Sequence, residues 1–106
     1  MINENLPLSE QYRVIAEQWV DADAAASLLE ETKSAVLNRM MLEKGEKAVN
    51  RAEMLVKASD EWRDHVNNIV EARKKASLLK VKVEYVRMKF HEWQSYEATR
   101  RAEMKL

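Results

Sequence analysis

Residues 62–93 read WRDHVNNIVEARKKASLLKVKVEYVRMKFHEW, and this stretch decides the fold. Its apolar residues recur every three or four positions without interruption, which is the repeat of a coiled-coil helix. The ten members of this repeat, which together form the seam, are Trp62, Val66, Ile69, Ala72, Ala76, Leu79, Val83, Val86, Phe90 and Trp93. Because a single helix cannot bury such a stripe by itself, the seam predicts a partner helix.

The composition of the chain is that of long helices. Its 106 residues include one Gly and one Pro, while 46% are hydrophobic and 34% are charged. No Cys is present, which excludes a disulfide framework and a thiolate zinc site. No apolar run reaches the ~18 residues of a membrane span, and residues 1–5 lack the basic and apolar regions of a signal peptide. These features predict a cytoplasmic, soluble protein with no membrane association.

Capping residues divide the chain into the elements of a single domain, residues 1–106. Ser9 and Ser59 are candidate N-caps, and Gly45 suits the left-handed position that ends a helix. The predicted elements are an N-terminal arm over 1–8, helix 1 over 9–44, a short helix over 46–58 and a long helix over 60–105. The predicted fold class is therefore all-α, an antiparallel, coiled-coil-like hairpin of two long helices joined through a short third helix.

One segment of the long helix has a competing interpretation. Residues 79–85 read LKVKVEY, and this alternation of apolar and polar residues is typical of a strand. The seam nevertheless continues through the segment, and no Gly, Pro, Asn or Asp offers a hairpin turn on either side of it. A helix is therefore the favoured prediction for this segment.

The two ends of the chain carry opposite charge although the net charge is zero. Acidic residues outnumber basic ones seven to one over residues 1–31, and basic residues outnumber acidic ones ten to four over residues 72–106. An antiparallel arrangement places these regions side by side, with Asp23 predicted to pair with Lys80 and Glu30 with Arg73. Exposed pairs contribute only about 0–1 kcal/mol each, so they select orientation while the apolar seam supplies stability.

A second apolar line runs along the long helix on another side. Its members are Leu78, Val81, Tyr85 and Met88, which form the back line. A helix that is apolar on two sides is buried on two sides. Either the short helix folds over the back line or two copies of the chain meet there, and we favour a homodimer with these four residues as its interface.

Three lysines, Lys75, Lys82 and Lys89, form a basic stripe about 20 Å long beside the seam. No acidic residue of helix 1 is predicted opposite them, because the matching positions are Gln18, Ala25 and Thr32. Together with Arg100 and Arg101, the stripe has the spacing to follow a phosphate backbone. A solvated surface that keeps a long rod in solution explains it equally simply, and is the favoured interpretation.

Candidates for chemistry are few. Glu61, Asp64 and His65 lie within one helical turn, and His91 adjoins Glu92, but each group offers too few ligands for a metal site. Phe90, Trp93 and Tyr96 have the character of base-stacking aromatics, although the first two belong to the seam. We therefore predict no catalytic residue, no metal, no cofactor and no small-molecule substrate, and do not expect an enzyme.

Residues 85–104, YVRMKFHEWQSYEATRRAEM, resemble the C-terminus of short helical proteins encoded by phages and prophages, often among replication and recombination genes. Weaker similarity extends over residues 19–34 and 57–63. The resemblance implies a phage origin but carries no assigned functional residues. The expected function is a non-enzymatic interaction or scaffold protein with an unidentified protein partner, and the alternative is direct nucleic-acid binding by the basic stripe and tail.

Overall fold

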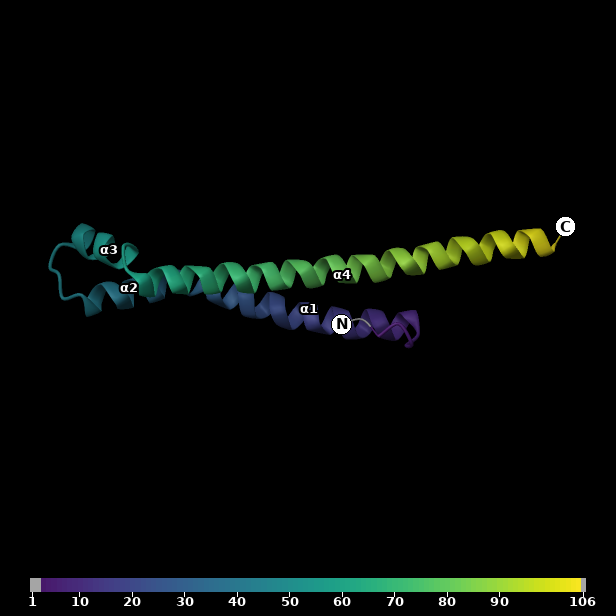
Figure 1. Ribbon diagram of the computed structural model, residues 1–106, viewed down its shortest axis with the longest axis horizontal. Coiled ribbons are helices and arrows are strands. Elements are labelled where there is room, and N and C mark those ends of the chain that lie inside the picture. The colour runs from purple at the N-terminus through teal and green to yellow at the C-terminus, as the bar shows by residue number, and fades with distance from the viewer. Residues whose placement is uncertain (1–2, 106) are drawn as a thin grey trace.

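The structure, a computed structural model, describes residues 3–105 and is entirely α-helical in its regular elements. The helices of this part of the chain are α1 (Leu8–Glu31), α2 (Lys33–Glu43), α3 (Val49–Lys57) and α4 (Asp60–Met104). They form a thin rod with extents of 83 × 21 × 18 Å, along which α4 runs for most of the length (Figure 1). The all-α class predicted from the sequence is confirmed, and residues 79–85 are helical.

The start of α4 is fixed by the cap predicted at Ser59. The Ser59 hydroxyl accepts a hydrogen bond from the Trp62 backbone N–H at 3.2 Å and donates one to the Val56 carbonyl at 2.6 Å. Asp60 and Glu61 lie in the first turn, where the positive end of the helix dipole favours acidic side chains. The cap thus joins the end of α3 to the start of α4.

The predicted single helix over residues 9–44 is wrong, because the structure divides it into α1 and α2 at Thr32. The Thr32 backbone has φ −92° and ψ 0°, and its hydroxyl donates to the Leu28 carbonyl at 2.7 Å. This bond accompanies the break, but it does not end a helix by itself, because Thr99 donates to the Ser95 carbonyl at 3.0 Å within the unbroken α4. The two long helices and short third helix of the prediction are therefore four helices.

The N-terminal cap was also predicted at the wrong residue. α1 begins at Leu8, its N-cap position is Pro7 with φ −55°, and no side chain caps it. The Pro7 carbonyl accepts the first helical hydrogen bond, from the Gln11 N–H at 2.9 Å. The prediction for Gly45 is confirmed, since its φ is +70°, a conformation that glycine adopts without steric cost.

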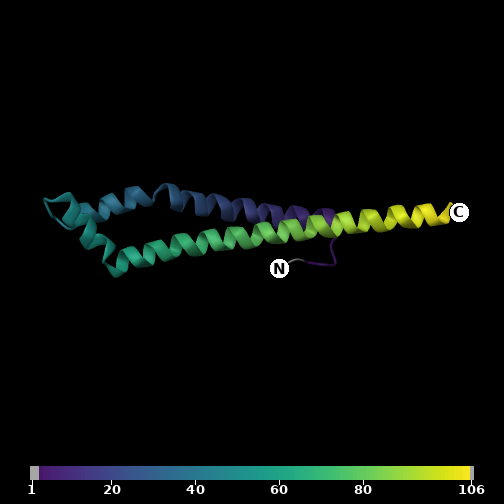
Figure 2. The same cartoon turned by 90° about the horizontal axis from the view of Figure 1, so that it is seen from above.

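α1 lies beside α4 and runs in the opposite direction, as both views show (Figures 1 and 2). The core between them is made of Ile15, Ala22 and Ala26 from α1 and of Ala76, Leu79, Val83 and Val86 from α4. Each large aliphatic side chain buried in such a core contributes about 1.5–3 kcal/mol. Ala26 and Ala76 are 0% and 1% exposed, and these small residues let the two backbones approach closely.

A second core lies at the end of the rod that is opposite the C-terminus. Its buried members are Met40 of α2, Val56 of α3 and Trp62 of α4. α3 therefore packs against α2 and the beginning of α4 rather than over the back line. The alternative in which the short helix covers the back line is excluded.

None of the helices in the described part of the chain combines the length and the apolar character needed to cross a membrane.

Candidate interaction surfaces

The residues considered as metal ligands do not form a cluster. Within residues 3–105, no group of three or more His, Asp or Glu side chains is placed to hold a metal ion. His65 packs against the Trp62 ring instead, with the ring centroids 5.7 Å apart. His65 is half-buried, and its Nε2 atom has no hydrogen-bond partner in the described chain.

Arg73 links α4 to α1 through two carboxylates. Its guanidinium lies 2.6 Å from both Asp23 Oδ1 and Glu30 Oε1, and it also donates to the Ser27 hydroxyl at 3.2 Å. The predicted Glu30–Arg73 pair is confirmed, but the predicted Asp23–Lys80 pair is wrong. Asp23 and Glu30 lie on the same side of α1, and the planar guanidinium has enough donors to bind both.

The hydrogen bond from Arg73 holds the pKa of the Glu30 carboxyl below its ordinary value. The pKa of Arg73 is raised in turn, chiefly by its hydrogen bonds to Glu30 and then Asp23. Both groups are solvent-accessible, so water screens the pair and its contribution to stability is modest.

We expect the Glu30–Arg73 contact to make the stability of the fold depend on pH in the acidic range. A carboxyl whose pKa is lower in the folded state stabilises the fold above its unfolded pKa, near 4.5, and this stabilisation is lost as the pH falls through the lower folded value. Glu30→Gln should therefore reduce the fall in melting temperature between pH 6 and pH 3. Glu31→Gln, an exposed neighbour, is the control, and equal effects of the two substitutions would contradict the assignment.

The basic stripe lies on the α4 surface, and within residues 3–105 none of its three lysines forms an ion pair. Lys75 and Lys82 line a shallow hollow with Gln18 of α1, the residue predicted to face them, and with Glu71 of α4. The Lys89 ammonium lies 5.6 Å from the centroid of the Tyr85 ring, in cation–π contact.

The basic tail lies further along α4. Arg100 is 3.6 Å from Glu97 on the same helix, whereas Arg101 forms no ion pair in the part of the chain that the structure describes. The structure thus places the three stripe lysines along one side of α4 and the two tail arginines near its end.

The back line is exposed along the middle of α4. Leu78, Val81, Tyr85 and Met88 are 55%, 60%, 50% and 61% exposed. At 100° per residue they lie on the side of α4 opposite the seam, and so on the side away from α1. This gives the chain a continuous apolar surface that its own helices leave uncovered.

The seam itself runs past the end of its partner helix. α4 extends beyond the start of α1 (Figure 1), and Phe90 and Trp93 are accordingly 41% and 50% exposed, with their rings stacked 6.1 Å apart. The prediction that these two side chains belong to the packed seam is therefore wrong for this end of the helix. We call residues 90–104 the α4 extension.

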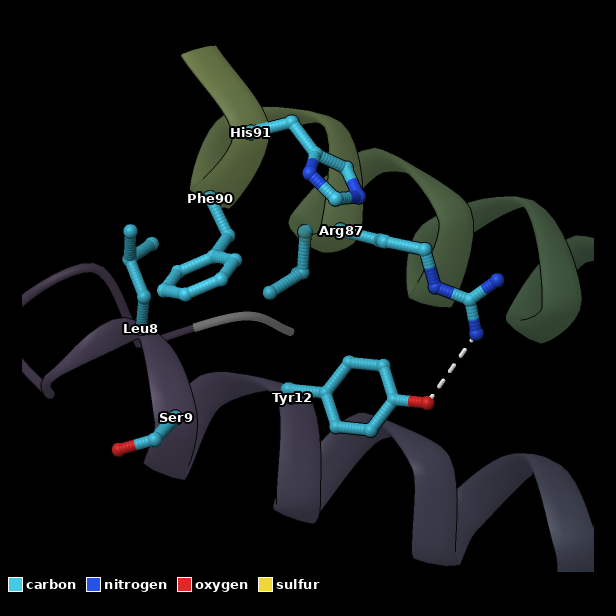
Figure 3. Close-up of a pocket in the computed structure, with 7 residues that line it drawn as sticks. Leu8, Ser9, Tyr12, Arg87, Phe90 and His91 are labelled. Atoms are coloured by element: carbon cyan, nitrogen blue, oxygen red, sulfur yellow. Dashed lines mark hydrogen bonds between the residues drawn. The ribbon is translucent and has the colours of Figure 1, made fainter. Parts of the chain in front are cut away.

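A pocket of about 420 Å³ marks the place where α1 begins against α4 (Figure 3). It is lined by Leu8, Ser9 and Tyr12 of α1 and by Val86, Arg87, Phe90 and His91 of α4. Arg87 donates to the Tyr12 hydroxyl at 3.2 Å and closes one side of the pocket. No signal in the sequence pointed to this step, because the predicted helix 1 over residues 9–44 is longer than the seam over residues 62–93.

Comparison of the chain with protein-family models, with curated proteins and with solved structures found no match.

Proposed function

We propose that the protein is a non-enzymatic helical adaptor that works as a homodimer. The observation that carries the proposal is the exposure of the four back-line side chains on the side of α4 away from α1. An exposed apolar surface of this kind marks a protein interaction site. In this proposal α1, α2 and α4 act as one antiparallel coiled-coil hairpin, which holds the back line straight. The resemblance of residues 85–104 to phage- and prophage-encoded proteins supports a role accessory to DNA replication or recombination.

The spacing of the back line favours an antiparallel pairing of two α4 helices. Its steps of three, four and three residues read the same in both directions. Leu78 then faces Met88 of the second copy, and Val81 faces Tyr85 of the second copy. An antiparallel pair also brings the basic stripes of the two copies together on one flank. Because salt screens repulsion between exposed charges, added salt should strengthen this dimer.

We expect sedimentation to show a dimer at tens of micromolar and Val81→Asp to convert it to monomer. Two unpaired carboxylates in an apolar interface should weaken dimerisation at least a hundredfold, by about 3 kcal/mol. Val20→Asp is the matched control, because Val20 is also 60% exposed but lies on α1. Circular dichroism should show unchanged helix content in both variants. A monomeric wild-type chain, or a dimer that weakens as salt is added, would contradict this arrangement.

The unpaired basic stripe supports a second candidate function, direct nucleic-acid binding. We expect this binding to be weak at ~150 mM salt, because the acidic residues of α1 offset much of the positive field. If the stripe does bind phosphates, the logarithm of the binding constant should fall linearly with the logarithm of the salt concentration. Replacing Lys75, Lys82 and Lys89 with Gln should make that slope shallower by up to about three. Micromolar binding of single-stranded DNA at that salt, lost in the triple variant, would favour this candidate over the adaptor.

A further inference from the structure

The side of α4 that carries the back line continues in both directions beyond Leu78 and Met88. At 100° per residue, the side opposite Val83 includes further residues at the same spacing of three or four. Those before the back line are Arg63, Asn67, Val70 and Lys74. Those after it, all in the α4 extension, are Glu92, Tyr96, Thr99 and Glu103. All of them are exposed, so one uncovered face runs along α4 from residue 63 to residue 103.

This face is symmetric about Val83, and its charges are complementary. Lys74 and Glu92 each lie nine residues from Val83, and Arg63 and Glu103 each lie twenty residues from it. An antiparallel pair of α4 helices centred on Val83 therefore places Lys74 opposite Glu92 of the second copy. The same pair places Arg63 opposite Glu103 of the second copy, so two copies together form four contacts between opposite charges.

The four charged residues have the capacity for these contacts. Within residues 3–105, Lys74, Glu92 and Glu103 form no ion pair. Arg63 lies 3.4 Å from Asp60 on its own helix, and the five donors of its guanidinium exceed what this one carboxylate requires. Pairing with a second copy therefore breaks no ion pair between the helices of one chain.

The uncharged residues of the face also match in this alignment. Val70 lies opposite Tyr96 of the second copy, and both are apolar side chains with high exposure, 56% and 65%. Asn67 lies opposite Thr99 of the second copy, and both carry hydrogen-bonding groups. The match thus continues over the whole face, outside the four residues of the back line.

Other alignments of two α4 helices bring unsuitable residues together. In a parallel pair each position faces its own copy, so Lys74 meets Lys74 and Glu92 meets Glu92. Moving the antiparallel pair by one repeat of seven residues places Lys74 opposite Tyr85 or Thr99 instead of an acid. Of these alignments, only the one centred on Val83 gives each acid of the face a basic partner.

We propose that α4 pairs with α4 of a second copy along this entire face, so that each α4 extension lies on the first turns of α4 of the other copy. This inference rests on the proposed homodimer and names the residues that fix its alignment. Stable interfaces bury about 800 Å² per partner and involve about 20–30 residues a side, more than the four back-line residues supply. The extension runs past the start of α1 (Figure 1) because its contacts lie on the second copy.

The alignment can be measured with spin labels, because the chain has no Cys and a single label can be placed at will. Asn67→Cys and Thr99→Cys are labelled separately, and both positions are exposed. In each variant alone, the two labels of a dimer should lie about 50 Å apart along the rod. A mixture of the variants should show an additional distance of about 20 Å or less, because the helices lie side by side. Absence of this short distance would overturn the proposal.

Charge reversal tests the ion pairs. Lys74→Glu should weaken the dimer about tenfold, because it replaces two attractive contacts with repulsive ones. Lys75→Glu is the matched control, since Lys75 is also exposed but faces the basic stripe of the second copy, so its reversal should not weaken the dimer. A mixture of Lys74→Glu with Glu92→Lys should form heterodimers in preference to either homodimer, because both contacts are then attractive. Equal weakening by the two lysine substitutions, or random mixing, would contradict this alignment.

These measurements separate the inference from the homodimer itself. A chain that stays monomeric at tens of micromolar contradicts the proposed function and this inference with it. A dimer that Val81→Asp abolishes, but in which residues 67 and 99 of the two copies lie far apart, overturns this inference alone. Added salt should narrow the difference between Lys74→Glu and the wild-type chain, because it screens both attraction and repulsion.

Discussion

Val83→Asp is expected to destabilise the protein by several kcal/mol, the largest effect of any substitution considered. Val83 is 3% exposed and lies in the core between α1 and α4. A carboxylate at this position loses its hydration without gaining a partner, at a cost of several kcal/mol. Because small domains are stable by only about 5–15 kcal/mol, this cost removes a large part of the total.

The control for Val83→Asp is its neighbour Lys82→Asp, which introduces the same side chain on the exposed flank of α4. Surface substitutions of this kind change stability by about 0.5 kcal/mol or less. Urea unfolding followed by circular dichroism should therefore separate the two variants clearly. Equal shifts of the unfolding midpoint would show that Val83 does not face α1.

Ile15→Ala is expected to destabilise the protein by about 2–4 kcal/mol, the second largest effect. Ile15 is 2% exposed and is the largest buried side chain that α1 contributes to this core. Removal of three carbons leaves a cavity beside Val83 and Val86 that two stiff helices close only in part. The same urea titration measures the effect as a lower midpoint with an unchanged slope.

Val20→Ala provides the comparison for Ile15→Ala, because Val20 belongs to the same helix but is 60% exposed. Alanine has the higher helix propensity, so this substitution should leave stability unchanged or raise it slightly. If both alanine variants lost the same stability, the assignment of Ile15 to the core would be wrong.

The seam could be predicted from the sequence because the fixed period of an α-helix places the apolar residues of its buried side three or four positions apart. Ala76, Val83 and Val86 are buried as the spacing predicts. The division of helix 1 at Thr32 could not be predicted, because threonine also occurs within uninterrupted helices, as Thr99 does in α4. The periodicity of α4 also does not reveal how long the helix packed against it is. The exposure of Trp93 could therefore be found only from the structure.

The contact surfaces could be predicted only in part. The spacing identified the back line, and the charge asymmetry correctly placed Glu30 beside Arg73. The prediction that Asp23 pairs with Lys80 was wrong, because it assumed a separate basic partner for each carboxylate. A single guanidinium that binds two carboxylates cannot be recognised from spacing, since its reach depends on the distance between the helices.

The double contact of Arg73 has a consequence for sliding of the two helices. An apolar repeat of seven residues would permit α1 to move along α4 by one full repeat, about 10 Å, with most seam positions still filled. Such a move places Arg73 between Ala16 and Asp23, or between Glu30 and Leu37, and either position leaves it a single carboxylate. Only one alignment gives Arg73 both acids. The two ion pairs therefore contribute little to stability, and their main effect is to favour one of several nearly equivalent alignments of α1 on α4.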